Sequence, residues 1–415
     1  MVRNAALSTA AVTIGIVAGE TSGDALAATL IHAVRARLPD ARFVGIAGPK
    51  MQAAGCEAWY PLETLAVRGF VEVVNRLPEL VRIRRALARR LAAERVRLFV
   101  GVDAPDFNLG LERRLKRRGV RTIHFVSPSV WAWRPERVAK IGRSADRMLA
   151  LFPFEPPVYE ASGVPVTFVG HPLAQAAATH GSRREARAQL KLGVAQPVFA
   201  LLPGSRSSEL EMHGDLVLQT AAAIHADRPD ARFLVPLATR STRDRFEAAL
   251  YRLGLEKLPL TLLYGHAGDA LRAADVALVA SGTATLEAAL ARCPHVIFYR
   301  VTPLTYRIVR RKLLLPWVGL PNVLAGRFVV PELLQDEATV ENLAQAAQNL
   351  YDDTVTRRRL EALFAGFAAA LSADTGALAA DAVATELRAA GVACRSRVST
   401  RQAAGRWRGR SWPRR

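Results

Sequence analysis

Ile14-Gly-Ile-Val-Ala-Gly-Glu-Thr-Ser-Gly-Asp24 and Val198-Phe-Ala-Leu-Leu-Pro-Gly-Ser-Arg206 are the two stretches that decide the fold. In each, an apolar run of strand length ends in small residues and glycine, and a segment with helical periodicity follows. Turns of this kind expose backbone amides to anions. Because the two stretches are far apart along the chain, each is expected to open its own α/β domain. The sequence therefore predicts a two-domain enzyme with a cleft.

The length of 415 residues and a composition that is half apolar suit two α/β domains better than one core. No apolar run approaches the roughly 18–20 residues that cross a bilayer, so any membrane contact is expected to be peripheral. No export signal is expected, because cleavage near Ala18 would remove the first strand. Cys56, Cys293 and Cys394 have no metal-binding or disulfide spacing, which favours a reducing cytoplasm.

The formal net charge of +20 is high, and eight arginines without any acid lie between Arg395 and Arg415. A basic surface favours anionic partners, either nucleic acid or anionic lipid headgroups, and the sign of the charge does not separate the two. Trp407 and Trp412 within this tail suit an interfacial membrane contact. A disordered, solvated extension is the plainer interpretation of the same segment.

Short apolar strands alternate with helix-like segments through most of the chain, which predicts parallel sheets covered by helices. The first series of expected strands is 13–17, 42–45, 97–102, 121–126, 148–151 and 166–169. The second series begins at Val198 and continues through 233–236, 261–264, 276–279 and 295–299. After Pro331 the chain is expected to be helical, over 341–351, 357–371 and 375–390.

The loss of the apolar pattern over residues 174–186 places the linker there. The expected domains are 1–175 as an acceptor- and membrane-facing domain, and 185–345 as a sugar-nucleotide domain. Residues 346–392 are expected to be helices that pack back onto the first domain, and 393–415 to be a basic, disordered tail.

The first glycine loop does not have the pattern of a common cofactor site. A nicotinamide enzyme would show G-x-G-x-x-G after its first strand, and no G-x-x-x-x-G-K-[ST] loop is present either. The glycines are therefore expected to serve another ligand. The candidate binding residues of this loop are Gly19, Glu20, Ser22 and Gly23.

The segment Ala280-Ser-Gly-Thr-Ala-Thr-Leu-Glu287 follows a strand of the second half and leads into a helix. Free amides at that helix start can hold a diphosphate, with Ser281, Gly282 and Thr283 as the candidate residues. The carboxylate of Glu287, one turn further on, suits the paired hydroxyls of a ribose. An ordinary capping arrangement, with Ser281 or Thr283 as the cap, explains the same pattern.

Gly204, Ser205 and Arg206 end the second decisive stretch at the carboxyl end of a strand, the edge where open α/β sheets bind ligands. A guanidinium at this place can neutralise a departing diphosphate. The alternative is a surface arginine paired with Glu209. His213 lies close by in the sequence, but it could equally be a surface residue with no role in binding.

Leu98-Phe-Val-Gly-Val-Asp-Ala-Pro-Asp-Phe107 carries a buried strand directly into two carboxylates. Asp103 is the better candidate for a general base, because a strand-end carboxylate that faces a dry cleft can take a proton from a sugar hydroxyl. Asp106 follows Pro105 at the start of a helical segment, so helix capping is its expected role.

Two further segments are open to two interpretations. Residues 65–85 interleave many apolar residues with arginines, which suits either a membrane-surface segment or a helix that covers the sheet. Ser127-Pro-Ser-Val-Trp-Ala-Trp133 follows a strand and suits either a packed corner or a wall that binds the acceptor.

Taken together, the motifs resemble those of lipid-A-disaccharide synthases, in order from about residue 13 to 385. The matching segments are 19–24, 45–49, 55–59, 103–107, 127–133, 202–206 and 281–287, followed by Leu320-Pro-Asn-Val-Leu-Ala-Gly-Arg327. So many ordered motifs are far more specific than a single glycine loop. The arginine-rich tail lies outside the resemblance.

The resemblance implies a GT-B glycosyltransferase with two Rossmann-like domains, whose last helices cross back to the first domain. It implies an inverting transfer from UDP-2,3-diacylglucosamine to 2,3-diacylglucosamine 1-phosphate (lipid X). The products would be the β-1,6-linked lipid A disaccharide 1-phosphate and UDP, made in lipopolysaccharide synthesis. Docking at the inner face of the cytoplasmic membrane and a homodimer are compatible with it. No cofactor and no metal is expected, because helix dipoles and cations can stabilise the leaving diphosphate.

By the same resemblance Asp103 is the candidate base for the acceptor 6-hydroxyl and Arg206 a catalytic ligand of the diphosphate, while Asn322 and Arg327 are weaker candidates for nucleotide binding. Two alternatives differ from this interpretation. Another GT-B enzyme of UDP-N-acetylglucosamine, a 2-epimerase or the lipid II-forming transferase, would share the nucleotide domain. A basic nucleic-acid-binding protein would share only the charge, and the chain has no recognisable RNA-binding motif, so no nucleic-acid partner is expected.

Overall fold

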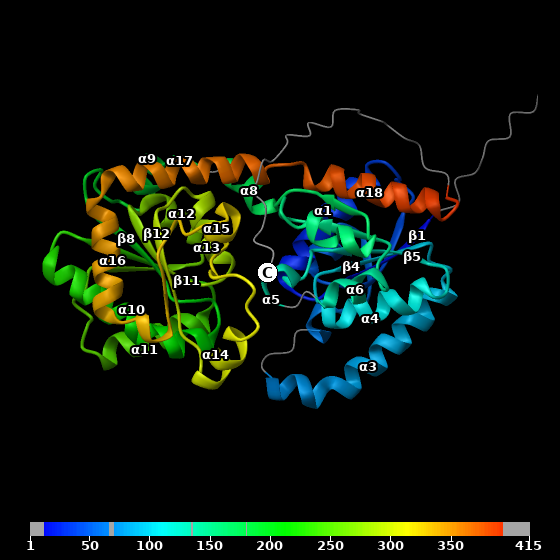
Figure 1. Ribbon diagram of the computed structural model, residues 1–415, viewed down its shortest axis with the longest axis horizontal. Helices are drawn as coiled ribbons and strands as arrows, with labels where there is room; N and C mark the ends of the chain where they lie inside the picture. The colour runs from blue at the N-terminus through cyan, green and yellow to red at the C-terminus, as the bar shows by residue number, and fades with distance from the viewer. Residues whose placement is uncertain (1–11, 66–69, 134–135, 180, 393–415) are drawn as a thin grey trace, which may run out of the picture. The chain divides into compact units, whose positions relative to one another are not determined.

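The computed structural model describes residues 12–65, 70–133, 136–179 and 181–392, and the chain divides into two compact units (Figure 1). Unit 1 runs to Pro172 and takes up the chain again at Leu371, and unit 2 is Leu173–Ala370. Each unit is built on one parallel sheet, with helices between most successive strands. This arrangement confirms the predicted α/β fold with two parallel-sheet domains.

Within the described residues, the sheet of unit 1 has the strand order β3-β2-β1-β4-β5-β6-β7. Its strands are β1 (Thr13–Ala18), β2 (Arg42–Ala47), β3 (Cys56–Pro61), β4 (Leu98–Val102), β5 (Arg121–Phe125), β6 (Arg147–Ala150) and β7 (Val166–Phe168). The chain order reverses between β1 and β4, which are paired neighbours. At such a switch point the loops after the two strands diverge and leave room for a ligand.

Helices cover both faces of this sheet because successive strand residues point to opposite sides. Ile16 packs in one core cluster with Leu30 and Val383, whereas Val17 packs in a second cluster with Leu91 and Leu111. The helices are α1 (Thr21–Arg35), α2 (Pro49–Ala53), α3 (Phe70–Ala93), α4 (Pro105–Lys116), α5 (Val130–Trp133), α6 (Arg137–Gly142), α7 (Pro156–Tyr159) and α18 (Thr375–Ala389). Short 3-10 turns lie at Leu62–Thr64 and Glu160–Ser162.

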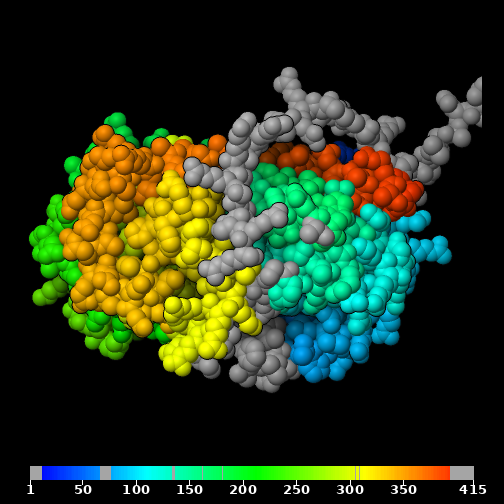
Figure 2. Space-filling view, in the orientation of Figure 1, coloured from blue at the N-terminus to red at the C-terminus, as the bar shows by residue number. Residues whose placement is uncertain are grey.

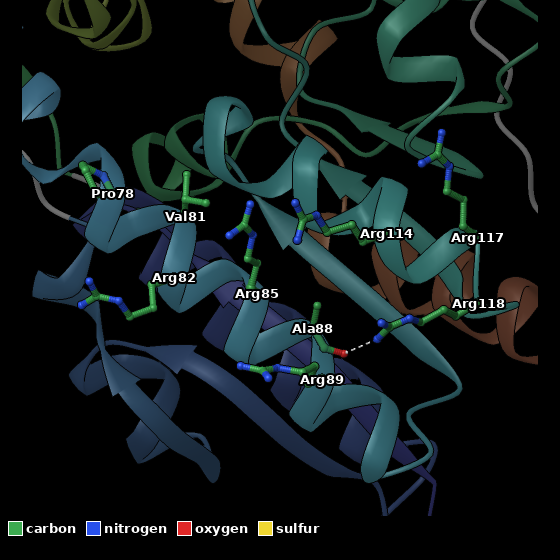
Figure 3. Close-up of a pocket in the computed structure, with 9 residues that line it drawn as sticks. All are labelled: Pro78, Val81, Arg82, Arg85, Ala88, Arg89, Arg114, Arg117 and Arg118. Carbon is green, nitrogen blue, oxygen red and sulfur yellow. Dashed lines mark hydrogen bonds between the residues drawn. The ribbon is translucent and has the colours of Figure 1, made fainter.

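Helices α3 and α4 adjoin at the surface of unit 1, where they appear blue and cyan in the space-filling view (Figure 2). Arginine side chains from both helices line the space between them (Figure 3). The described part of α3 therefore covers the sheet with one side and presents basic side chains on the other. Residues 66–69 lie outside the described residues, and so do the side chains of residues 70–75.

Within the described residues, the sheet of unit 2 has the order β10-β9-β8-β11-β12-β13, and its switch point lies between β8 and β11. The strands are β8 (Val198–Leu202), β9 (Arg232–Leu237), β10 (Leu260–Tyr264), β11 (Val276–Ala280), β12 (His295–Tyr299) and β13 (Glu332–Leu334). The helices are α8 (Pro172–Ala178), α9 (Arg183–Gln189), α10 (Ser207–Asp227), α11 (Arg240–Arg252), α12 (Ala267–Ala273), α13 (Thr283–Leu290), α14 (Pro303–Arg310), α15 (Leu320–Ala325), α16 (Val340–Asp352) and α17 (Thr354–Leu371). A 3-10 turn lies at Gln335–Glu337.

The strands predicted from apolar runs are all present, with ends that shift by a residue or two. The edge strands β3 and β13 were not predicted, because neither is an apolar run: only Cys56 of β3 is buried, and all of β13 is half-buried. The stretch 174–186, expected to be a linker, is largely helical and lies in α8 and α9.

The two last helices, α17 and α18, form one stretch, Thr354–Ala389, that is long and apolar enough to cross a membrane by length and composition. This finding corrects the expectation that no stretch of the chain is long and apolar enough to cross a membrane. The residues 372–374 separate the two helices, and α18 buries Ala379, Val383 and Leu387 in the core of unit 1. Packing in a protein core therefore accounts for the apolar side of α18.

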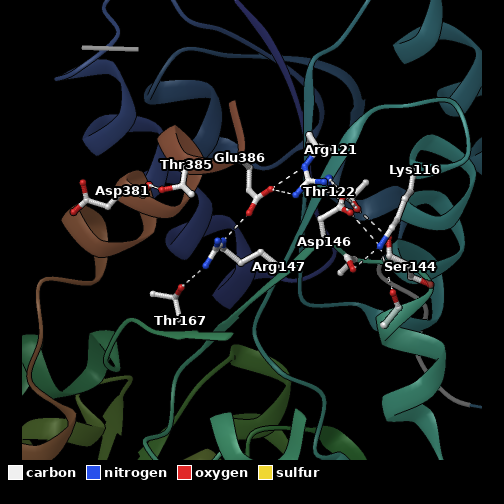
Figure 4. A network of polar contacts seen from close by, with 12 residues as sticks. Lys116, Arg121, Thr122, Ser144, Asp146, Arg147, Thr167, Asp381, Thr385 and Glu386 are labelled. Carbon is white, nitrogen blue, oxygen red and sulfur yellow. Dashed lines mark hydrogen bonds and ion pairs between the residues drawn. The ribbon is translucent and has the colours of Figure 1, made fainter. Parts of the chain in front are cut away.

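A buried carboxylate fastens α18 to the sheet of unit 1 (Figure 4). Glu386 accepts hydrogen bonds from Arg121 Nε over 2.9 Å and from Arg147 Nε over 2.8 Å. Arg121 also pairs with Asp146 over 3.3 Å, and Lys116 pairs with the same carboxylate over 3.1 Å. The C-terminal helix is thus part of unit 1 through both apolar packing and ion pairs.

Candidate active site

The predicted residues of unit 1 lie at its switch point, where the loops after β1 and β4 run side by side. Gly19 follows β1 and Asp103 follows β4. A Cβ atom built on Gly19 would overlap the Cβ of Ala104, so only glycine allows the two loops to approach this closely. The structure therefore brings together two motifs that are far apart in the sequence.

Asp103 and Ala104 both have left-handed backbone conformations, with φ of 53° and 43°. Such strain in non-glycine residues is held by the surrounding structure and is frequent at functional sites. The Asp103 amide donates to the carbonyl of Phe125 over 2.8 Å, and its carbonyl accepts from Asn108 Nδ2 over 2.8 Å. The half-buried carboxylate has no hydrogen bond or ion pair with any described residue. It is free to act on a ligand.

Asp106 does not have the capping role expected from the sequence. The N-cap position of α4 belongs to Ala104, and no side-chain cap is formed there. The carboxylate of Asp106 is 82% exposed and pairs with Arg137 over 3.1 Å. Helix α4 begins at Pro105, directly after the left-handed turn, so Asp106 lies within the first turn and not at the cap position. Asp103, unlike Asp106, has no ion pair with a described residue.

A buried polar cluster lies directly behind the Asp103 turn. Glu112 and His124 are fully buried, and Glu112 Oε1 lies 2.6 Å from His124 Nδ1. Burial raises the pKa of Glu112, and the neighbouring His124 opposes this shift. Asn108 lies one turn before Glu112 on α4 and holds the Asp103 carbonyl. No single one of these residues stood out in the sequence, because each lies within an ordinary helix or strand pattern.

The Gly19–Asp24 loop divides into exposed and structural residues. Glu20 and Ser22 are exposed at the start of α1, and Gly23 is buried against β4. The carboxylate of Asp24 is buried and accepts three amide hydrogen bonds from the first turn of α2, over 3.0–3.1 Å. The acid of this motif therefore caps a helix, and Glu20 and Ser22 are the side chains left for a ligand.

Glu155 is a buried acid at the carboxyl edge of unit 1 that the sequence analysis did not single out. Its carboxylate accepts from the amides of Leu151 and Phe152 over 3.1 and 3.0 Å and from Trp131 Nε1 over 3.3 Å. Burial raises its pKa to about 7. The available signal was an acid among prolines and phenylalanines directly after a strand. Trp131 also packs edge to face on Phe154, so this part of the 127–133 motif forms a packed corner.

In unit 2 the loop after β8 is held by Glu209 of α10. Gly204 has a φ of 126°, and Glu209 Oε2 accepts from the amides of Ser205 and Arg206 over 2.8 and 3.2 Å. The alternative of an Arg206–Glu209 ion pair is wrong, because Glu209 binds backbone and the guanidinium pairs with no described residue. Arg206 is exposed at the carboxyl edge of the sheet.

His213 is not a surface residue, as the sequence allowed, but is fully buried. Its Nδ1 donates to the carbonyl of Pro203 over 2.8 Å, and its Nε2 accepts from the amide of Arg300 over 3.0 Å. Burial lowers its pKa, which favours the neutral ring that this pair of bonds requires. His213 thus ties the loop after β8 to the end of β12.

The loop after β11 lies beside the loop after β8 at the switch point. Gly282 is the N-cap residue of α13, and no side chain caps this helix. The capping alternative for Ser281 and Thr283 is therefore not what the structure adopts. Thr283 and Gly282 are exposed, which leaves the first amides of α13 open to a ligand. Burial raises the pKa of Glu287, whose carboxylate pairs with no described residue.

The two weaker candidates of unit 2 differ in exposure. Asn322 is fully buried: Nδ2 donates to Val330 and Glu332, and Oδ1 accepts from the amides of Val329 and Val330. The structure thus gives Asn322 a role in holding the chain before β13, and its nucleotide binding stays a prediction. Arg327 is exposed after α15. No group of three or more metal-ligating side chains was found among the described residues.

Paired Rossmann-like units with candidate sites at their switch points define a GT-B protein. The UDP-GlcNAc 2-epimerase of Neisseria meningitidis has the same fold, with a TM-score of 0.58, 11% identity and coverage of 91% of this chain and 99% of that one. MurG of Acinetobacter baumannii gives 0.55 at 13% identity, with coverage of 90% and 99%. At these identities the likeness concerns the fold alone.

The family follows from the sequence. The model of the lipid-A-disaccharide synthetase family matches residues 14–375. The lipid-A-disaccharide synthase of Chromobacterium violaceum is 55% identical over 373 residues, which is 90% of this chain and 97% of that protein. The synthase of Pseudomonas aeruginosa is 50% identical over 370 residues, 89% and 97% of the two chains. The chain belongs to the lipid-A-disaccharide synthase family and is a glycosyltransferase.

Proposed function

We propose that the enzyme transfers 2,3-diacylglucosamine from its UDP derivative to 2,3-diacylglucosamine 1-phosphate, with inversion at the anomeric carbon. Membership of the family supports the reaction, and one structural observation supports the choice of Asp103 as the base. That observation is the unpaired carboxylate of Asp103 in a strained turn at the switch point of unit 1. The products are the β-1,6-linked disaccharide 1-phosphate and UDP.

Asp103 is the proposed general base. It accepts the proton of the acceptor 6-hydroxyl while that oxygen bonds to the anomeric carbon of the donor. The bond from the anomeric carbon to the diphosphate oxygen breaks, and its electron pair leaves with UDP. Attack from the face opposite the leaving group inverts the configuration. Glu20 and Ser22 are the proposed contacts with the acceptor, since both are exposed beside Asp103.

Unit 2 is the proposed donor site. The open first turn of α13, from Gly282, faces the diphosphate with amides and the positive end of the helix. Arg206 neutralises the charge that develops on the leaving oxygen, and its guanidinium is available because Glu209 binds the loop backbone and the Tyr299 hydroxyl instead. Glu287 is the proposed partner of the ribose hydroxyls. No metal is required in this scheme.

The catalytic assignment is tested by following disaccharide and UDP on thin-layer plates with purified protein, both substrates and EDTA. Asp103→Asn is expected to lower turnover about 10²–10⁴-fold without unfolding. Asp106→Asn is the matched control, because it changes an exposed acid of the next turn, and it should retain activity. Near-normal turnover of the Asp103 variant would remove it from the mechanism. Product that appears only with added magnesium would contradict the metal-free scheme.

We also propose that the enzyme works as a peripheral protein at the inner face of the cytoplasmic membrane. Both proposed substrates carry acyl chains, and the net charge of +20 favours an anionic surface. The apolar segment with Val67, Phe70 and Val74 is the sequence-based candidate for insertion, although Val67 and the side chains of the other two lie outside the described residues. Serine at these three positions should move the enzyme from the membrane to the soluble fraction without unfolding. A homodimer stays a prediction, which light scattering tests.

A further inference from the structure

A cavity of about 930 Å³ lies between α3 and the end of α4, and arginines dominate its lining (Figure 3). Arg82, Arg85 and Arg89 come from successive turns of α3. Arg114, Arg117 and Arg118 come from the last turn of α4 and the residues after it. Pro78, Val81 and Ala88 complete the lining.

The cavity holds these charges without acidic partners. None of the six arginines pairs with a carboxylate among the described residues. The one hydrogen bond from their side chains to a described residue joins Arg118 Nη1 to the carbonyl of Ala88 over 3.1 Å. The pKa of the adjacent Arg84 is lowered by burial first and then by the charges of Arg114 and Arg85. Mutual repulsion of this kind is relieved when an anion binds.

Ordinary helix stability explains only part of this arrangement. Basic residues in the last turn of α4 interact favourably with the helix dipole, which accounts for Arg114 and its neighbours. Arg82 and Arg85 lie in the middle of the 24-residue helix α3, where that effect is absent. Successive turns of α3 therefore carry exposed arginines on the side that faces the cavity, a row that the helix dipole does not account for.

The α4 wall of the cavity lies at the far end of that helix from the proposed acceptor site. Helix α4 begins two residues after Asp103 and ends at Lys116, so Arg114 lies about 14 Å further along the helix axis. The 1-phosphate and the 6-hydroxyl of the acceptor belong to one sugar ring, which is much shorter than this separation. A second anion therefore suits the arginines at the end of α4.

Apolar residues beside the cavity identify the source of that anion. Leu77 on α3 is 54% exposed, and Pro78 and Val81 follow it at the cavity wall. A helix that presents apolar side chains next to a row of arginines has the character of an interfacial membrane helix. Arginine binds phosphate oxygens in pairs, which suits a lipid phosphate.

We propose that this arginine cavity binds the phosphate headgroup of an anionic phospholipid and so fixes how unit 1 meets the membrane. The site deepens the proposed peripheral location and rests on it. It adds a specific headgroup contact to the insertion of the apolar segment. Because the contact is electrostatic, its strength falls as salt is added.

The test is co-sedimentation of the full chain with vesicles of phosphatidylcholine, with and without phosphatidylglycerol. The variant Arg82→Gln/Arg85→Gln/Arg89→Gln is expected to bind the anionic vesicles on the order of 100-fold more weakly, about 5-fold per arginine. Arg114→Gln/Arg117→Gln changes the other wall and should weaken binding about 25-fold by the same reasoning. Retained binding in both variants overturns the proposal.

The matched control is Arg97→Gln/Arg143→Gln/Arg358→Gln, which removes the same charge from exposed arginines outside the cavity. It should weaken binding less than about 5-fold. Equal losses in the control and in the α3 variant would show that only total charge matters and overturn the proposal. The lipid assignment is overturned if the cavity variants lose binding to inorganic phosphate or to RNA but still bind the anionic vesicles as the wild type does.

Glycosyl transfer with detergent-dispersed substrates is measured in parallel. The α3 variant should keep wild-type turnover there, because none of its changes touches the proposed catalytic residues. Absence of transfer by the wild-type enzyme would contradict the proposed reaction and leave the vesicle result intact. The two proposals therefore fail by different measurements.

Discussion

Asn108 Nδ2 donates a hydrogen bond over 2.8 Å to the backbone carbonyl of Asp103. The same amide lies 3.4 Å from the carbonyls of Val17 and Val102, at the ends of β1 and β4. One buried side chain thus spans the switch point of unit 1 and holds the left-handed turn that carries the proposed base. The position of the Asp103 carboxylate thus depends on a fully buried residue.

Asn108→Ala is expected to lower kcat about 10- to 100-fold, because a small displacement of a catalytic group is costly. The KM for the UDP donor should stay unchanged, since the proposed donor residues lie in unit 2. Asn108→Asp keeps the shape but places an acceptor against the Asp103 carbonyl, so it should be at least as damaging. Steady-state kinetics with both substrates varied separates an effect on kcat from an effect on the KM for the UDP donor.

A general loss of stability has to be separated from this positioning effect. Ser144→Ala removes another buried hydrogen bond of unit 1, from Ser144 Oγ to the carbonyl of Lys140 over 2.9 Å. This control should lower the unfolding temperature by a similar amount and leave kcat unchanged. If the two variants lost activity equally, Asn108 would have a structural role only.

Gly204→Ala tests whether the loop after β8 shapes the donor site. Gly204 has a φ of 126°, and a Cβ built there would lie 2.5 Å from Glu209 Oε2. The substitution should displace Glu209 from the amides of Ser205 and Arg206 and weaken UDP binding at least about 10-fold. Calorimetric titration with UDP measures the affinity.

Gly214→Ala provides the control in the same unit. Gly214 lies within α10, and a Cβ atom added there would meet no atom within 4 Å. Alanine there should stabilise the helix by about 0.5–1 kcal/mol and leave UDP affinity unchanged. An unaltered affinity in the Gly204 variant would mean that the loop does not shape the donor site.

The strand pattern and the strand-end position of Asp103 were readable from the sequence because both follow from local order along the chain. An apolar run that ends in glycine or an acid needs a buried strand before it and a turn after it. Parallel strands end at one edge, which is why the structure places the motifs after β1 and β4 at the same side of the sheet. The edge strands β3 and β13 lack such runs and were missed.

Roles that depend on distant partners were not readable. Glu209 binds the backbone of Ser205 and Arg206, whereas a charge pair with Arg206 was one of the two interpretations that the sequence allowed. His213 lies on a helix of ordinary composition, and only the fold places its ring between two loops. Side-chain partners of this kind are set by the register of α10 on the sheet, which no local pattern contains.

Glu155 gives unit 1 a titratable group near neutral pH. Its pKa in the folded protein is raised by burial from 4.5 to about 7. The folded state therefore keeps this proton while the unfolded state loses it, and the contribution to stability falls as pH rises from 4.5 to about 7. Glu155→Gln should remove up to about 1.4 kcal/mol of this fall per pH unit.

Urea unfolding across that pH range, in wild type and variant, measures the difference between the two slopes. The difference is needed because two buried histidines also make stability depend on pH. The pKa values of His171 and His295 are lowered from 6.5 to about 4, so their contribution to stability rises with pH in that range, opposite to that of Glu155. Trp131→Phe serves as the control, since it removes a hydrogen bond to Glu155 and keeps the acid. Identical slopes in wild type and the glutamine variant would show that Glu155 does not titrate in this range.

Glu386→Ala tests whether a buried ion pair or apolar packing holds α18 on unit 1 (Figure 4). The Glu386 side chain is 3% exposed and binds both Arg121 and Arg147. Arg121 keeps Asp146 as a partner in the variant, but Arg147 loses its carboxylate. Breaking a buried pair from one side is expected to lower the free energy of unfolding by about 3 kcal/mol.

Asp381 lies on the same helix and pairs with Arg37, but its side chain is 58% exposed. Asp381→Ala should therefore cost less than about 1 kcal/mol, because exposed pairs gain little in water. Urea unfolding of the two variants beside the wild type compares a buried and an exposed pair on one helix. Similar losses in both would show that burial does not strengthen the Glu386 pair. A loss near zero in both would mean that apolar packing, through residues such as Val383 and Leu387, holds α18 in place.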